Sequence, residues 1–334
     1  DAVSYQRYKD GLLPRLVDLA VLNTNIISAS DGFVNLPDSI KERFIQALTE
    51  ADPNSFSKEN RIELLDHIRE ALNWINSYGD EEQKKFATGL SQILERFTTD
   101  DVIERLGWLL TTPWPHLPEG EPDEYEAKNT AVKKAQEVAA REILDKVALD
   151  KILGFASTIQ YPAILGVALG KVIRDEKEDA EILDVLVQNI SQWILIMGYS
   201  QGRIEVVGPS WIDKQIERMK SKGNFSSDFC ALLYSGLPEG ADTWAKVSMN
   251  GKAVEDAYWK RARGFSRQNR TEDSPIAVEK LLDVERPNAA LEIAGDPKAS
   301  IPSALLKRLL EALLSMDRKN QVSTMDEYHL AYIF

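Results

Sequence analysis

The acidic run from Asp100 to Glu104 comes nearest to a catalytic motif in its residue types and spacing. Two adjacent aspartates followed by a glutamate have the form with which some all-helical enzymes hold a magnesium diphosphate. Such enzymes also need a second acidic cluster with Asn or Ser further along the chain, and the sequence shows none. Thr98 and Thr99 precede the aspartates, and carboxylates that follow a cap residue stabilise a helix N-terminus. We therefore favour a helix start over a metal site.

A second motif, from Gly166 to Lys171, has the outline of a phosphate-binding loop. That loop needs four residues between its glycines and a Ser or Thr after its lysine. Here three residues separate Gly166 from Gly170, and Val172 follows the lysine. The segment also lies inside an apolar helical pattern. We therefore predict that these glycines let two helices approach closely, and we predict no nucleotide site.

The histidines and the single cysteine show no metal-ligand spacing. His67, His116 and His329 lie in separate segments, and none has a partner four residues away. Cys230 stands beside Phe229 in an apolar pattern, which is typical of a small buried residue. One cysteine excludes an internal disulfide and a cysteine-based zinc site. We predict no metal and no cofactor, while a Cys–His dyad stays open until the fold is known.

The densest basic cluster lies around Tyr258 and Phe265, where cations alternate with aromatic rings. Basic and aromatic side chains together can bind phosphate or a single nucleic-acid strand. The alternative is a helix over 253–263 that ends at Gly264, where cations match the C-terminal dipole. We favour the helix end and still regard the cluster as the best polar patch for a partner. The candidate partner-binding residues are Trp114, Trp259, Lys260, Arg261, Arg263 and Arg267.

The composition is that of a folded, acidic protein. Of the 334 residues, 43% are hydrophobic and 28% are charged, and the formal net charge is −13. This balance disfavours nucleic acid as the main partner, because duplex binding depends on neutralising phosphates with Lys and Arg. No apolar stretch reaches the ~18 residues that span a bilayer. We expect a cytoplasmic protein that binds another protein or other domains of its own polypeptide, and no membrane.

The elements that position these residues are predicted to be helices. Over 58–77, apolar residues recur every three or four positions after Ser57, a favourable cap. The same period predicts helices over 82–97, 101–110, 130–147, 162–173, 180–197 and 211–219. Alternating runs of β-branched residues are nearly absent, and 204–207 is the only plausible strand. The predicted fold class is all-α.

Prolines punctuate the C-terminal part of the chain. Pro275, Pro287 and Pro302 each open a short apolar helix. Helices of this length cannot bury their apolar faces singly, so they stack. We predict an α-solenoid-like stack of helical hairpins with degenerate repeats of the HEAT or TPR kind.

The segment 113–126 is the clearest boundary in the sequence. It holds four prolines followed by an acidic run, and no regular element tolerates that proline density. We predict a Pro-rich acidic linker or loop here, between an N-terminal helical region at 1–112 and a helical-repeat region at 127–334. Its Leu-Pro-Glu-Gly tetrapeptide at 117–120 recurs at 237–240. A divergent internal duplication would explain this repeat. We favour the alternative that the same helix–loop–helix sequence pattern occurs twice independently.

Both ends suggest a piece of a longer polypeptide. Asp1 is not an initiator Met, and a capped helix that begins at Thr324 reaches Phe334 without a stop signal. We expect the repeat region to continue beyond Phe334.

Five stretches over 105–334 together carry a resemblance to a known class of proteins. They are WLLTTPWPHLPEG at 108–120, YPAILGVALG at 161–170, ADTWAKVSMNGKAVEDAYWKR at 241–261, RPNAALEIA at 286–294 and EYHLAYIF at 327–334. Together they resemble the helical-repeat C-terminal regions of large bacterial multidomain proteins of the STAND NTPase or antiphage-defence kind. The resemblance implies that a separate N-terminal module carries enzymatic activity while the repeats sense a partner. No catalytic residue transfers with it.

We therefore expect a non-enzymatic helical-repeat region for protein interaction, sensing or autoinhibition. The alternative is an all-α toroid enzyme, such as a glycosidase with two carboxylates beside tryptophan platforms. A scaffold that only oligomerises its parent protein is the third interpretation.

Overall fold

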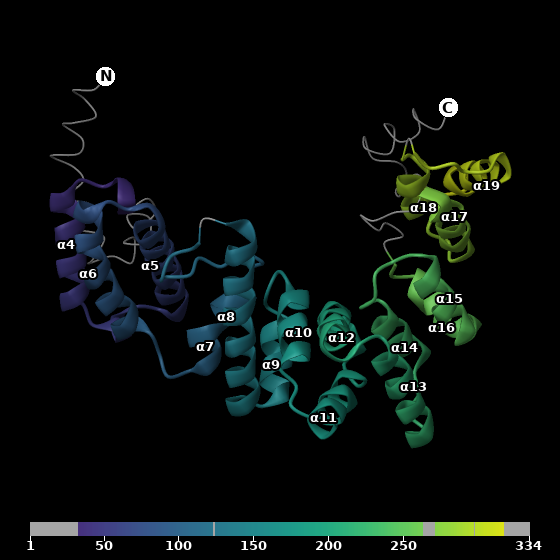
Figure 1. The fold of residues 1–334 in the computed structure, drawn as a ribbon, viewed down its shortest axis with the longest axis horizontal. Helices are drawn as coiled ribbons and strands as arrows, with labels where there is room; N and C mark the ends of the chain where they lie inside the picture. Colours follow the sequence, from purple (N-terminus) through teal and green to yellow (C-terminus); the bar gives the residue numbers. More distant parts are fainter. Residues whose placement is uncertain (1–32, 123, 263–270, 297, 317–334) are drawn as a thin grey trace. The chain divides into compact units, whose positions relative to one another are not determined.

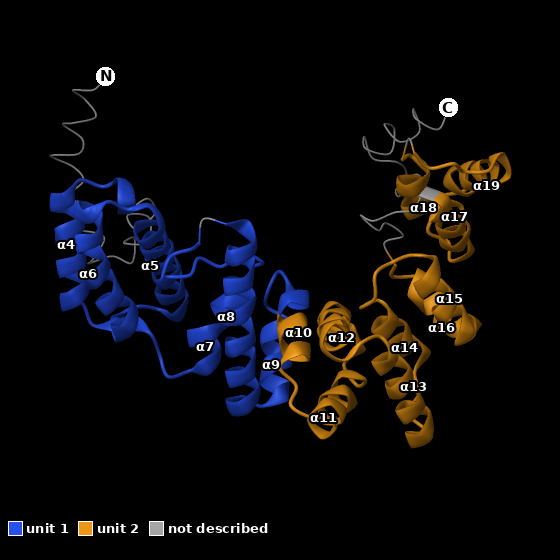
Figure 2. Ribbon diagram, in the orientation of Figure 1, with its two compact units in different colours: residues 1–164 blue, residues 165–334 orange. Residues whose placement is uncertain are grey.

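The computed structural model describes residues 33–122, 124–262, 271–296 and 298–316. Every regular element within these ranges is a helix (Figure 1), so the predicted all-α class is confirmed. Contacts divide the chain into two compact units, Asp1–Ile164 and Leu165–Phe334 (Figure 2). This division falls after Ile164, and the predicted boundary at 113–126 stays a prediction. The stack of hairpins stays a prediction, and the end segment 324–334 lies outside the described residues.

Unit 1 forms its helices where caps and apolar periodicity coincide. Its elements are η1 (Phe33–Asn35), α4 (Asp38–Glu50), η2 (Pro53–Ser55), α5 (Lys58–Tyr78), α6 (Glu81–Phe97), α7 (Val102–Leu106), η3 (Gly107–Leu110), α8 (Tyr125–Lys146) and α9 (Leu149–Ala156), followed by the start of α10 (Pro162–Lys171). Ser57 accepts the Asn60 N–H and caps α5 as predicted. Asp80 and Gln83 form a reciprocal capping box at the start of α6.

The first three long helices of unit 1 enclose an apolar core. Helices α4, α5 and α6 pack together (Figure 1), and their centre is rich in aromatic rings. The buried phenylalanines are Phe33, Phe44, Phe56, Phe86 and Phe97. Two ring pairs have centroids 5.4 Å apart (Phe33 and Phe44) and 5.3 Å apart (Phe56 and Phe97). Offset and edge-on aromatic pairs add about 0.5–1.5 kcal/mol each beyond the area they bury.

Unit 2 begins within α10 and continues through shorter helices. They are α11 (Glu176–Leu186), η4 (Ile190–Gln192), α12 (Trp193–Val207), α13 (Ser210–Lys222), α14 (Ser227–Tyr234), α15 (Ala241–Met249), α16 (Lys252–Trp259), η5 (Thr271–Asp273), α17 (Ser274–Asp283), α18 (Pro287–Ala294) and α19 (Ser303–Leu314). The single helix predicted over 180–197 is wrong, because the chain breaks at Asn189, whose side-chain amide donates to the Val185 carbonyl at 2.8 Å. The predicted strand at 204–207 is also wrong, since these residues complete α12.

A buried carboxylate joins three helices of unit 2. Asp179 on α11 is 1% exposed and accepts hydrogen bonds from the Tyr199 hydroxyl and the Trp211 indole N–H, both at 2.6 Å. Arg203 Nε lies 3.4 Å from the same carboxylate, within ion-pair distance but outside hydrogen-bond geometry. The Arg203 side chain also donates to the Gly170 carbonyl at 3.2 Å. This group, the Asp179 cluster, fixes α11, α12 and α13 to one another.

Glycines bring α10 and α12 into backbone contact. A Cβ atom added at Gly166 would overlap the Leu195 carbonyl oxygen, and one added at Gly202 would overlap that of Val167. The predicted role of the Gly166 to Lys171 motif, close helix approach, is therefore confirmed. No larger residue fits these positions without moving a helix backbone.

No single helix in the described ranges is long and apolar enough to cross a membrane. The segments Glu176–Leu186 and Ile190–Val207 pass that test only as a pair, and they are bent by 109° at their junction.

Candidate functional site

The predicted basic and aromatic patch is not assembled as expected. Trp259 is 1% exposed, and its ring centroid lies 5.1 Å from that of Trp244. The prediction that Trp259 belongs to a surface patch is therefore wrong: α16 buries almost its whole circumference at this end. Lys260 is exposed, whereas Arg261 pairs with Asp228 at 2.8 Å.

Two further members of that patch, Arg263 and Arg267, lie outside the described residues. The helix predicted to run to residue 263 ends at Trp259. Sequence spacing located the end of α16 within a few residues but did not show which of its side chains face inward.

Trp114 stands at the surface, as an anchor for a partner would. It is 42% exposed, and its ring centroid lies 5.6 Å from that of Tyr125, which is 67% exposed. The two rings are tilted by 49° and come from the Pro-rich segment and the first residue of α8. Tyr125 was missed at the sequence level because the predicted helix began at residue 130, which left Tyr125 in an irregular segment.

Side chains from α5 hold the Pro-rich segment in place. The Asn73 amide donates to the Leu117 carbonyl at 2.8 Å, and the Asn76 amide donates to the Pro118 carbonyl at 2.6 Å. The Glu121 N–H donates to the Ser77 hydroxyl at 2.8 Å. Three side chains on adjacent turns of one helix therefore dock a segment that has no regular structure of its own.

A glycine and a second helix complete this docking. Gly120 has φ +90°, and a Cβ there would lie 3.1 Å from the Asn76 backbone. Only glycine adopts this backbone without strain. Just before the Pro-rich segment, the Gln136 amide of α8 donates to the Leu109 carbonyl at 3.0 Å and to the Thr112 carbonyl at 3.4 Å. The predicted linker or loop is thus an anchored loop within unit 1.

Exposed carboxylates lie in the same loop and on either side of Tyr125 in the sequence. Glu119, Glu124 and Glu126 are exposed, while Glu121 is bound by Lys128 and its side chain is 6% exposed. His116 is exposed in the same loop, as predicted for a loop residue. We name Trp114, Tyr125, Glu119, Glu124 and Glu126 the aromatic–acidic surface.

A separate pocket of about 220 Å³ lies inside unit 1, between α5, the α7–η3 turn and α9. The Arg69 guanidinium stacks on one of its walls, with its central carbon 4.3 Å from the Trp108 ring centroid, and donates to Asp66 at 2.7 Å. Burial raises the pKa of the Asp66 carboxyl, although 52% of that side chain is exposed, and Arg69 opposes the effect. Burial likewise lowers the pKa of Arg69.

A second carboxylate also borders this pocket, and it belongs to the acidic run from Asp100 to Glu104. Glu104 accepts a hydrogen bond from Arg61 Nε at 2.9 Å, and Lys58 lies 3.8 Å away. Asp101 caps α7 by accepting the Glu104 N–H at 2.9 Å. The interpretation of this run as a helix start is confirmed for Asp101.

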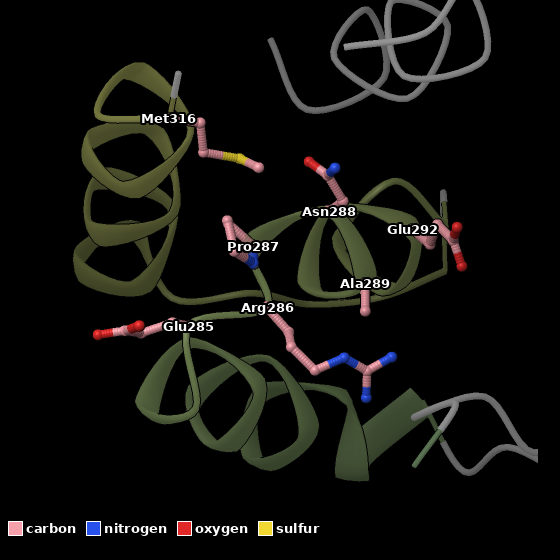
Figure 3. Close-up of a pocket in the computed structure, with 7 residues that line it drawn as sticks. All are labelled: Glu285, Arg286, Pro287, Asn288, Ala289, Glu292 and Met316. Atoms are coloured by element: carbon pink, nitrogen blue, oxygen red, sulfur yellow. The ribbon is translucent and has the colours of Figure 1, made fainter. Parts of the chain in front are cut away.

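The turn between α17 and α18 borders a larger hollow of about 620 Å³ (Figure 3). Arg286 extends beneath α18 in this view, and its guanidinium donates to the Trp259 carbonyl at 2.8 Å and to the Ala262 carbonyl. Burial lowers the pKa of Arg286, while Glu239 and Glu292 oppose this effect. Because its guanidinium already binds the end of α16, Arg286 serves packing within unit 2.

The single cysteine is part of the packed interior of unit 2. Cys230 is fully buried, and burial raises the pKa of its thiol to about 12. Within the described part of the chain, no group of three or more His, Cys, Asp or Glu side chains is placed to hold a metal ion.

Searches against protein-family models, curated proteins and solved structures found no match to this chain.

Proposed function

We propose that this chain is a protein-interaction region and that its aromatic–acidic surface binds a basic segment of a partner protein. The observation that carries this proposal is the exposed Trp114–Tyr125 pair, which joins a loop that three α5 side chains hold in place to the first residue of α8. An exposed aromatic pair on a fixed loop offers a partner a preorganised contact, because little entropy is lost when it binds.

The charge beside the rings defines the partner's chemistry. Lys and Arg bind aromatic faces through cation–π contacts worth about 0.5–1 kcal/mol at exposed sites. Glu119, Glu124 and Glu126 add attraction that salt screens beyond about 8–10 Å. A basic segment satisfies both the rings and the carboxylates, whereas an acidic segment is repelled by a chain of net charge −13.

The wider setting follows from the resemblance. Within that proposal, the hairpins form a solenoid-like stack in a larger cytoplasmic bacterial protein of the defence kind. The aromatic–acidic surface then acts in sensing or autoinhibition, with its partner a separate protein or another domain of the same polypeptide. Nucleic acid is disfavoured by the same acidic charge.

Binding of a fluorescein-labelled peptide of alternating Gly and Arg to the whole chain tests the proposal. We expect Trp114→Ala and Tyr125→Ala each to weaken binding about fivefold, since ~1 kcal/mol is lost with each ring. Trp193→Ala is the matched control, because Trp193 is 38% exposed and lies in unit 2. Equal binding by Trp114→Ala and the parent chain, or equal binding of a Gly–Gln peptide, would overturn the proposal.

A carboxylate-dependent glycosidase is the second candidate, since Asp66 and Glu104 border one pocket with Trp108. A raised pKa suits Asp66 to donate a proton. Against this, each carboxylate is already bound by an arginine. Hydrolysis of nitrophenyl glycosides that is lost in both Asp66→Asn and Glu104→Gln would establish the enzyme, and its absence in the parent chain would leave the interaction region.

A further inference from the structure

The pocket between α5, α7–η3 and α9 is walled by apolar side chains from each of these elements. Its apolar residues are Ile62, Leu65, Ile103, Trp108 and Phe155. The Trp108 indole N–H donates to the Arg105 carbonyl at 3.0 Å, which fixes the ring that forms one wall. Phe155 packs against Gly107, where a Cβ would lie 2.8 Å from the ring. The walls are therefore set by tight contacts on two sides.

The charged groups at this pocket are paired with one another. Arg69 is bound to Asp66, and Glu104 is bound to Arg61 with Lys58 nearby. A charged ligand would meet groups whose charges are already balanced by their partners, so it gains little net attraction. The surface of the pocket is mostly apolar, so most hydroxyl groups of a sugar would face it without a hydrogen-bond partner. An uncharged apolar group meets no such cost.

The volume sets the size of that group. An apolar cavity of about 150 Å³ binds benzene, and this pocket measures about 220 Å³. We propose that the pocket binds a single uncharged aromatic group somewhat larger than benzene, such as an indole or phenyl ring. The site is separate from the aromatic–acidic surface and goes beyond the function proposed above. The ring belongs either to a free small molecule or to a Trp or Phe side chain of a bound protein.

Titration of the whole chain with indole, followed by saturation-transfer NMR and by the melting temperature, tests the site. We expect saturable indole binding, with indole-3-acetate and tryptamine at least tenfold weaker because each carries a charge. Gly107→Ala should weaken indole binding at least tenfold, because the new methyl group displaces Phe155. Gly154→Ala is the matched control on the same helix as Phe155, since a Cβ there meets no atom within 4 Å.

A second variant keeps the test decisive if Gly107→Ala does not fold. Ile103→Phe enlarges a wall residue and should abolish indole binding while the helical circular dichroism stays unchanged. Indole affinity that is the same in these variants and in the parent chain would overturn the site, as would tighter binding of either charged probe. Trp114→Ala should leave indole binding unchanged, which separates this site from the peptide surface.

Competition identifies the source of the ring. N-acetylphenylalaninamide carries a phenyl ring on a blocked peptide unit. Displacement of indole by this compound shows that the pocket admits a ring carried on a peptide chain, as a partner's side chain would be. Indole binding that the compound does not disturb assigns it to a free small molecule, and both results support the site.

Discussion

The two units bury their helices by different means. In unit 1, phenylalanines fill the space between α4, α5 and α6, and the contacts among them are apolar. In unit 2, the centre of α11, α12 and α13 is a carboxylate with its donors, and α10 touches α12 through glycines. Apolar packing tolerates exchange among side chains of similar volume. A buried hydrogen-bonded carboxylate, or a glycine in contact with a neighbouring backbone, tolerates almost no substitution. We therefore expect unit 2 to be more sensitive to mutation than unit 1.

The largest effect we expect comes from removing the carboxylate of unit 2. Asp179→Leu leaves the Tyr199 hydroxyl, the Trp211 N–H and the Arg203 charge buried without it, and should cost about 3–5 kcal/mol. Ile68→Leu, a volume-conserving change at a buried position in the core of unit 1, should cost less than about 1.5 kcal/mol. Urea unfolding measures both. Thiol labelling of the buried Cys230 reports the opening of unit 2. Similar costs for the two variants would remove the contrast between the units.

A smaller effect is expected where helices touch. Gly202→Ala forces a methyl group against the Val167 carbonyl and should destabilise unit 2 by about 1–3 kcal/mol. Hydrogen exchange in α10 and α12 should rise while exchange in α4 to α6 stays the same. A Gly202→Ala variant as stable as the parent chain would mean that α10 and α12 can separate at no cost.

Acid should act on unit 2 through a second buried carboxylate. Burial alone would raise the pKa of Glu255, but hydrogen bonds from Ser248 and Lys280 outweigh it and hold that pKa below its ordinary value near 4.5. A lowered pKa stabilises the folded state above pH 4.5, and this contribution is lost as the pH falls through the folded pKa. Glu255→Gln should therefore reduce the acid sensitivity of hydrogen exchange in α15 to α17. An unchanged pH profile would contradict this role.

The smallest change is expected to stabilise. Gly154 lies in α9 with open space around its Cα, and alanine favours a helix over glycine by about 0.5–1 kcal/mol. Gly154→Ala should raise the melting temperature, in contrast to the same substitution at Gly202. A lower melting temperature for Gly154→Ala would show that α9 needs its glycine for a contact not yet identified.

The same contrast explains which elements the sequence predicts well. Helices α5 and α6 keep apolar residues on one face, so the predicted ranges agree with them to within one residue. Helix α12 is apolar on several sides because it is buried among its neighbours, and the period therefore runs on across the break at Asn189. The break depends on the Asn189 side chain, which binds the last turn of α11. The spacing of hydrophobic residues cannot reveal such a polar contact.

The candidate site was predictable only in part. Trp114 between two prolines could be identified as exposed, because prolines exclude it from a helix and from its buried face. Its companion Tyr125 could not be, since the pairing depends on where α8 begins. The docking by Asn73, Asn76 and Ser77 joins residues more than forty positions apart, and polar residues on an amphipathic helix give no sign of which ones accept a loop.

Arg286 has a consequence for how the chain is made. Its guanidinium reaches the carbonyls of Trp259 and Ala262, which lie 27 and 24 residues earlier. During synthesis, α16 therefore leaves the ribosome before the donor that completes its C-terminal end exists. Until Arg286 emerges, water must serve these carbonyls. The segment that carries Arg286, between α17 and α18, thus completes a helix that is translated before it.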